Sequence, residues 1–282
     1  MTANGPRWLS AGLLCLILWP GPAAAGDRAW EEHMAAGAAA YRSGDYGEAE
    51  KRLSAAVKES RLFRAGDPRL AVTLNNLGTL YRALGRLEEA GPLYRRAIEV
   101  WESALGADHI QIATGLNNLA AVYNDQGRLA EAEVLYKRTV AVWEKTLGPD
   151  HPRVATGLNN LAVLYRVQKR YAEAEPLYQR AAAIWEKTLD AGHPQIAAGL
   201  NNLAYLYHVQ GKFAAAESLY RRALAIWEKA LGPRHPTVAR VLDNMAELLR
   251  RTGHGAEAAR MEARARAIRE TSVKTRPGES AP

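Results

Sequence analysis

A 42-residue period runs through most of the sequence and limits what the chain can fold into. Asn-Asn pairs recur at this interval, and so do two tyrosine columns, one tryptophan column and one histidine column. The columns are Asn75/Asn76, Asn117/Asn118, Asn159/Asn160 and Asn201/Asn202, continued by Asp243-Asn244; Tyr81, Tyr123, Tyr165 and Tyr207; Tyr94, Tyr136, Tyr178 and Tyr220; Trp101, Trp143, Trp185 and Trp227; and His109, His151, His193 and His235. Because independent columns share one interval, the chain is a repeat protein.

The pattern within one period predicts two helices. Apolar residues three and four apart run from Pro152 for about 16 residues and again over residues 172–189. Proline suits the first helical position, and three sister repeats place glycine where the first helix ends, a position that favours a left-handed cap. Since an isolated helical hairpin cannot bury its apolar face, we expect an all-α solenoid of about six stacked hairpins.

The repeat also resembles a known family. Its pattern residues in order are Leu74, Leu77, Gly78, Tyr81, Gly85, Ala90, Tyr94 and Ala97, which match the tetratricopeptide repeat in type and spacing. That family usually has a 34-residue period and a proline closing its second helix, where this chain has Glu102 and its equivalents. The longer unit, with Leu-Asn-Asn-Leu-Ala in its first helix, looks like the kinesin light chain variety. The resemblance implies a tetratricopeptide-type α-solenoid whose first helices line a concave surface.

The period divides the chain into five predicted segments. A signal peptide covers residues 1–25, and a degenerate helical hairpin covers residues 26–66. Four 42-residue repeats occupy residues 67–234, and a capping repeat with polar substitutions follows at residues 235–270. We expect residues 271–282 to be a disordered tail.

The first 25 residues have the pattern of an export signal. One basic residue, Arg7, precedes a twelve-residue apolar run, and small residues at 23–25 fit a cleavage site before Gly26. The run is shorter than the roughly 20 apolar residues that span a bilayer, so we expect no integral membrane span. Leu14 before Cys15 does not fit a lipoprotein signal. The mature chain is therefore expected to be periplasmic or secreted, and cleavage removes its only cysteine.

Neither metal nor catalytic chemistry is indicated. Packed helices lie about 8–10 Å apart, so histidines of successive repeats are too far apart to share one metal ion, whose ligand atoms lie about 2 Å from it. A turn or helix-cap role suits the histidine column, and core packing suits the tryptophan column. The sequence contains no phosphate-binding glycine loop and no recognisable nucleophile set. We expect no enzyme activity and no cofactor.

The asparagine columns are the best candidate for a binding site. Asparagine is unfavourable inside a helix by several tenths of a kcal/mol relative to alanine, and a carboxamide complements the peptide group of an extended chain. On the family's concave surface, one amide per repeat would hold about every third residue of a bound peptide. The alternative is a ladder of amides that only joins neighbouring helices. The candidate residues are Asn75, Asn76, Arg82, Asn117, Asn118, Asn124, Asn159, Asn160, Arg166, Asn201, Asn202, Tyr205, His208 and Asn244.

The charge pattern suggests the kind of partner. Cations outnumber anions among the predicted groove residues, so a protein segment with acidic residues is expected, without nucleic acid. The net charge is +7 over the whole chain, and residues 250–282 contain eight basic and four acidic residues. A second hypothesis is therefore that the basic C-terminal repeat makes a peripheral envelope contact with anionic lipid or cell-wall polymer.

Overall fold

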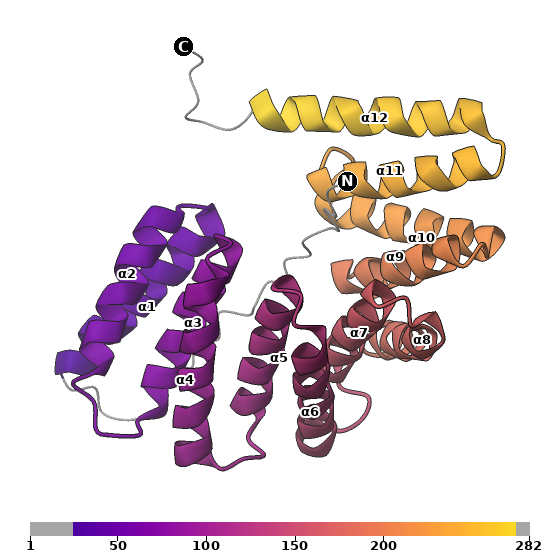
Figure 1. The fold of residues 1–282 in the computed structure, drawn as a ribbon. Helices are drawn as coiled ribbons and strands as arrows, with labels where there is room; N and C mark the ends of the chain where they lie inside the picture. The colour runs from indigo at the N-terminus through magenta and orange to yellow at the C-terminus, as the bar shows by residue number, and fades with distance from the viewer. Residues whose placement is uncertain (1–24, 275–282) are drawn as a thin grey trace. The chain divides into compact units, whose positions relative to one another are not determined.

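The computed structural model describes residues 25–274, which form helices joined by short turns. The twelve helices of this part of the chain pair in order into six hairpins, as α11 and α12 illustrate (Figure 1). The predicted all-α architecture is confirmed. The helices are α1 (Ala25–Ser43), α2 (Tyr46–Ser60), α3 (Pro68–Ala83), α4 (Leu87–Leu105), α5 (Ile110–Asp125), α6 (Leu129–Leu147), α7 (Pro152–Val167), α8 (Tyr171–Thr188), α9 (Pro194–Val209), α10 (Phe213–Leu231), α11 (Pro236–Arg251) and α12 (Gly255–Lys274).

The helix bounds follow the 42-residue period, with one correction at the C-terminus. Helix α12 continues to Lys274, so residues 271–274 are helical rather than part of a disordered tail. The rest of that tail, residues 275–282, lies outside the described residues. The predicted signal segment also lies outside them, except for Ala25, at which α1 begins.

The histidine column caps the first helix of four hairpins. His109, His151, His193 and His235 each precede such a helix, and each Nδ1 accepts a hydrogen bond from the backbone N–H two residues later, at 3.3, 3.1, 3.2 and 3.2 Å. These bonds satisfy one of the N–H groups that a helix start leaves without a partner. The predicted cap role is confirmed. In residues 25–274 no group of three or more His, Cys, Asp and Glu side chains could hold a metal ion.

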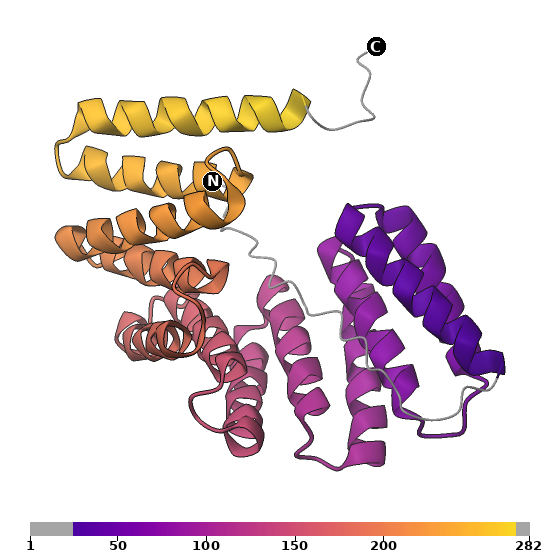
Figure 2. The ribbon, with the colours of Figure 1, turned by 180° about the vertical axis from the view of Figure 1, so that it is seen from behind.

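The chain divides into two compact units, each with three hairpins. One unit ends at Gly148 and contains α1–α6, and the other begins at Pro149 and contains α7–α12. Within each unit, neighbouring hairpins join through the second helix of one and the first helix of the next, as Figure 2 shows for α4 and α5 and for α8 and α9. First helices also contact each other directly, α3 with α5 and α7 with α9 and α9 with α11.

Tryptophans of the repeated column lie in the contacts between hairpins within each unit. Trp101, Trp143, Trp185 and Trp227 are all buried, which confirms their predicted core role. Trp101 packs against Gly115 of α5, and Trp185 packs against Gly199 of α9. The buried area of these rings supplies a large share of the apolar contact that holds neighbouring hairpins together.

Candidate functional site

The asparagine columns form ladders along the first helices. In the first unit, Asn118 Nδ2 donates to Asn75 Oδ1 at 3.0 Å. In the second unit, Asn202 donates to Asn159 at 2.9 Å, and Asn244 donates to Asn201 at 3.3 Å. The second asparagine of one hairpin thus bonds to the first asparagine of the preceding hairpin. The amides join α3 to α5, α7 to α9 and α9 to α11.

The amides differ in how far they are exposed. The side chains of Asn75, Asn76, Asn117, Asn118, Asn201 and Asn202 are between 2% and 9% exposed. Asn159, Asn160 and Asn244, all in the second unit, are partly exposed. The ladder alternative is therefore present in the structure, and the amides of α7 and α11 are the ones most open to a ligand.

Three candidate asparagines of the first unit lie outside these ladder bonds: Asn117, which donates to its neighbour Asn118 at 3.5 Å, and Asn76 and Asn124. Asn76 is buried in α3, and neither its Oδ1 nor its Nδ2 has a hydrogen-bond partner among the described residues. Asn124 lies near the end of α5 and is partly exposed, with a buried Oδ1 that likewise has no partner in residues 25–274. Neither Asn76 nor Asn124 therefore joins one first helix to the next.

The first helices carry the ladder amides on one side of each unit. In the second unit α7 contacts α9 and α9 contacts α11 directly, and the amide bonds cross both contacts. We call the surface of α7, α9 and α11 that carries Asn159, Asn160 and Asn244 the inner face of the second unit.

Arg82 and Arg166 occupy equivalent positions in the two units but have different surroundings. Arg82 Nε lies 2.9 Å from Asp125 Oδ2, and this ion pair neutralises the arginine. The residue equivalent to Asp125 for Arg166 is Val209. Arg166 forms no ion pair with any described residue, and its guanidinium carbon lies 4.9 Å from the ring centre of Tyr205.

Aromatic rings continue from Tyr205 across the second unit. The ring centres of Tyr205 and His208 are 6.3 Å apart, and those of His208 and Phe213 are 6.0 Å apart, both in edge contacts. The guanidinium carbon of Arg251 lies 5.4 Å from the ring centre of Phe213. Arg166, Tyr205, His208, Phe213 and Arg251 therefore form one row, which we call the aromatic row. Arg166, Tyr205 and His208 are among the candidate site residues, and Arg251 is a residue of the groove predicted from the sequence, whereas Phe213 is neither.

Two polar groups beside this row are buried without hydrogen-bond partners among the described residues. One is the hydroxyl group of Tyr220, and the other is the imidazole of His208, at both nitrogen atoms. Burial raises the pKa of Tyr220 and lowers the pKa of His208, because a buried group resists becoming charged. Both side chains are therefore neutral at pH 7.

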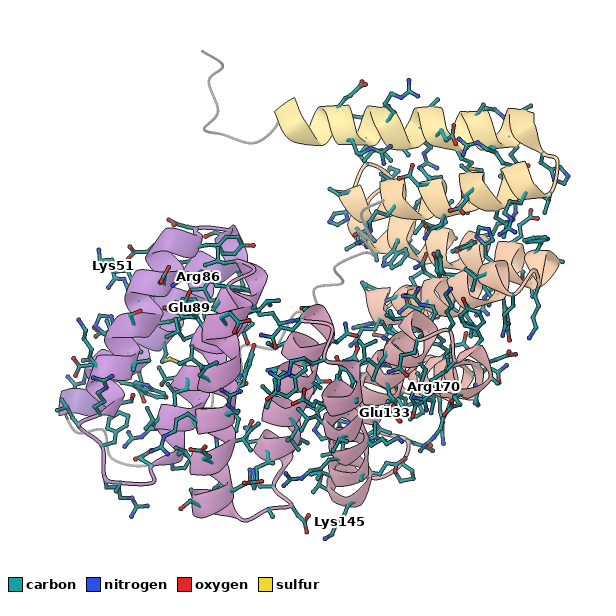
Figure 3. The ribbon with its side chains drawn as sticks, viewed as in Figure 1. Lys51, Arg86, Glu89, Glu133, Lys145 and Arg170 are labelled. Atoms are coloured by element: carbon teal, nitrogen blue, oxygen red, sulfur yellow. The ribbon has the colours of Figure 1, made fainter. Side chains whose placement is uncertain are left out.

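A second set of arginines forms ion pairs and ring contacts at the turns within the hairpins. Arg86 lies next to Glu89 at the start of α4 (Figure 3), with Nε 2.6 Å from the carboxylate, and its guanidinium carbon lies 4.0 Å from the ring centre of Tyr81. Arg128 and Arg170 make the same contacts one and two repeats later. These pairings hold the carboxylates of Glu89, Glu131 and Glu173 in place. The hydrogen bonds from Arg86 and Arg128 lower the pKa of Glu89 and Glu131. The carboxylates at these helix starts therefore belong to structural ion pairs.

The basic C-terminal hairpin is partly neutralised. Arg250 pairs with Glu262, Arg264 with Glu228, and Arg269 with Asp243. Arg260 and Arg266 of α12 are exposed and form no ion pair with a described residue. The positive charge of this hairpin that remains available to a polyanion is therefore smaller than the sequence count indicates.

The repeat geometry agrees with a comparison against protein families. A family model described as tetratricopeptide repeat matches residues 32–103, 69–123, 111–187, 153–226 and 195–271. The chain belongs to the tetratricopeptide repeat family. The fold of this family is that of a protein-interaction scaffold, because stacked repeats create an extended surface for a partner. No curated protein matches the chain in sequence.

Solved tetratricopeptide-type structures are similar along most of the chain. A putative kinesin light chain from Podosopora anserina with nearly identical repeats is 27% identical, with a TM-score of 0.62, and the match covers 74% of this chain and 98% of that one. The predicted kinesin light chain-like repeat is thereby confirmed. BtubC from P. vanneervenii (20% identity, TM-score 0.65, 92% and 97% covered) and the apo form of RapI (13%, 0.65, 87% and 99%) share the fold.

Among residues 25–274, no helix is both long and apolar enough to cross a bilayer.

Proposed function

We propose that this protein is an exported, non-catalytic scaffold that binds an extended segment of a partner protein along its inner face. The observation that carries the proposal is the row of amides on α7, α9 and α11, of which Asn159, Asn160 and Asn244 are partly exposed. An amide engaged in one ladder bond retains further donors or acceptors, which can pair with peptide groups of an extended chain.

The spacing of the amides suits such a chain. First helices in contact lie about 8–10 Å apart, and an extended peptide advances about 3.3–3.6 Å per residue. Each hairpin can therefore hold about every third residue by its backbone. Backbone contacts of this kind are independent of sequence, so specificity comes from side chains between the amides, for which Arg166, Tyr205 and His208 are the candidates.

Substitutions of Asn159 can separate peptide contact from ladder stability. Asn159→Asp keeps the oxygen that accepts from Asn202 but removes the amide donors, whereas Asn159→Ala removes both. We expect both variants to capture less of the partner proteins from envelope extract, and only the alanine variant to lose thermal stability. Ala225→Ser on the exposed side of α10 is the control. Unchanged capture by both Asn159 variants would contradict the amide contact.

Export is a separate part of the proposal and has its own test. The sequence before Gly26 supports it, and cell fractionation followed by N-terminal sequencing of the purified protein tests it. A mature chain that begins at Gly26 in the periplasmic or secreted fraction is the expected result. A cytoplasmic chain with an uncleaved N-terminus would contradict it.

An alternative function is binding of anionic lipid or cell-wall polymer by α12, favoured by the exposed Arg260 and Arg266, which pair with no described carboxylate. For the lipid form, the test is co-sedimentation with phosphatidylglycerol vesicles at low and high salt, since contacts between exposed charges weaken with salt. Salt-sensitive binding that the double variant Arg260→Gln/Arg266→Gln abolishes would support this alternative. Absence of binding by the unaltered chain would exclude the lipid form.

A further inference from the structure

The two units compensate the charges of their first helices differently, and this difference indicates which unit binds an acidic partner. In the first unit, Asp125 neutralises Arg82. In the second unit, the equivalent Arg166 has no ion-pair partner among the described residues and lies over Tyr205 instead. A cation that the fold leaves without a counter-charge beside an aromatic ring is available to an anionic ligand.

A second cation of the same kind lies at the other end of the aromatic row. Arg251 at the end of α11 is exposed, contacts the ring of Phe213, and forms no ion pair with any described residue. Glu247 lies one helical turn earlier and is also exposed, but the two side chains do not pair. Its neighbour Arg250 is directed to Glu262 of α12. Within residues 25–274, the row therefore has at each end an arginine without an ion-pair partner, while the charge of Glu247 acts on His208 and Tyr220.

The two units also differ at a buried hydroxyl group. In the first unit, the hydroxyl of Tyr94 lies 3.0 Å from Thr79 Oγ1. The residue equivalent to Thr79 is Tyr205, and the equivalent Tyr220 hydroxyl makes no hydrogen bond with the described residues although the side chain is fully buried. Buried polar groups are usually paired, but both amide atoms of Asn76 in the first unit also lack partners within residues 25–274, so the two arginines are what distinguishes the second unit.

We propose that the second unit selects a partner segment with two acidic side chains, one bound by Arg166 and the other by Arg251. This inference rests on the proposed function and specifies the partner for the same face. Helices α7 and α11 are two steps of about 8–10 Å apart. An extended peptide covers that span in about five to six residues, so the two carboxylates are separated by that number of positions.

Synthetic peptides test the spacing directly, whatever the natural partner is. The probes are fluorescein-labelled peptides of alanine, glycine and serine that contain two aspartates from two to nine positions apart. Fluorescence anisotropy with the mature chain should show the tightest binding at a separation of five or six. Replacing both aspartates with asparagine should weaken binding about tenfold or more, because two charge-assisted contacts are lost.

Protein variants assign the binding to the two arginines. Arg166→Gln and Arg251→Gln should each weaken the best peptide about tenfold, whereas Arg234→Gln, at an exposed arginine in the turn before α11, should leave its affinity unchanged. Thermal unfolding of each variant checks that the fold is retained. Affinity that does not depend on spacing, or that falls equally with Arg234→Gln, would overturn the proposal.

The peptide experiment and the Asn159 capture experiment can fail independently of each other. If Asn159→Asp lowers capture of natural partners while the peptide series shows no preferred spacing, this inference fails and the groove-binding scaffold stands. If neither experiment shows binding that depends on the inner face, both fail.

Discussion

The indole ring of Trp185 occupies the space that a side chain at Gly199 would need. The ring atoms Cζ3 and Cε3 lie 2.7 and 2.9 Å from the position of a Cβ atom on Gly199, closer than such atoms approach in folded proteins. Helices α8 and α9 therefore pack closely because residue 199 has no side chain. Trp185 Nε1 also donates to the backbone oxygen of Pro152 at 3.3 Å, which fixes the ring toward α7.

Gly199→Ala should destabilise the second unit. A rigid ring cannot give way as a flexible side chain does, so the extra methyl group overpacks the contact, at a cost of about 1–3 kcal/mol in the free energy of unfolding. Urea unfolding of the two proteins measures this change. Gly192→Ala, at a loop position with open space and an ordinary φ, is the matched control and should have little effect. Equal stability of both variants would show that the contact does not limit packing.

Lys169→Gly should stabilise the second unit. Lys169 has φ of 61° at the position where sister repeats have glycine, and it is the only non-glycine residue in the described part of the chain with positive φ. The left-handed conformation costs a side-chain-bearing residue about 1 kcal/mol, so the free energy of unfolding should rise by that amount. Gly211→Ala, the reverse change one repeat later at φ 78°, should lower it similarly. A decrease with Lys169→Gly would contradict this explanation.

The cap formed by His151 should make stability depend on pH. Burial, and then the positive charge of Arg153, lowers the pKa of His151 in the folded state, whereas the unfolded chain keeps a value of about 6.5. The unfolded state therefore binds more protons just below that pH, so the free energy of unfolding should fall as the pH decreases through about 6.5.

Two variants distinguish the stability that His151 contributes as a helix cap from the pH dependence caused by its protonation. His151→Asn retains a capping acceptor and should flatten this part of the pH profile, leaving the contribution of His208, whose pKa burial also lowers. His151→Ala should cost about 1 kcal/mol at pH 8 because the cap is lost. An unchanged pH profile in the asparagine variant would contradict the assignment.

The amide ladder should produce an energetic coupling between Asn159 and Asn202. Their side chains are joined by one buried or partly buried hydrogen bond, so a double-mutant cycle with alanine at both positions should give a coupling of about 1 kcal/mol. Asn159 and Asn244 are not bonded to each other, and their alanine substitutions should be additive. Equal coupling in both cycles would mean that the ladder bond is not the source.

The sequence predicts the features that recur at one interval and depend on residue type alone. The tryptophan column could be recognised as core and the histidine column as caps, because each occupies a fixed place on a helix with a known period.

Contacts between different hairpins were harder to predict. The ion pair of Arg82 with Asp125 joins positions 43 residues apart, and its presence depends on which helical turns of α3 and α5 lie opposite each other. The hydroxyl of Tyr94 hydrogen-bonds to Thr79, whereas the equivalent Tyr220, which has Tyr205 in place of that threonine, has no hydrogen-bond partner among the described residues. The combination of tyrosine, arginine and glutamate at the starts of α4, α6 and α8 could have been found from the sequence, since it follows the period.

The central claim is that a partner segment lies along the inner face of the second unit, and site-specific photo-cross-linking in cells tests it most directly. A benzophenone amino acid is placed at Val163 on the inner face of α7, and in a second strain at the exposed Ala225 of α10. After irradiation, we expect discrete protein adducts from position 163 that Asn159→Asp diminishes, and none of these adducts from position 225. The same adducts from both positions, or from position 225 alone, would contradict it.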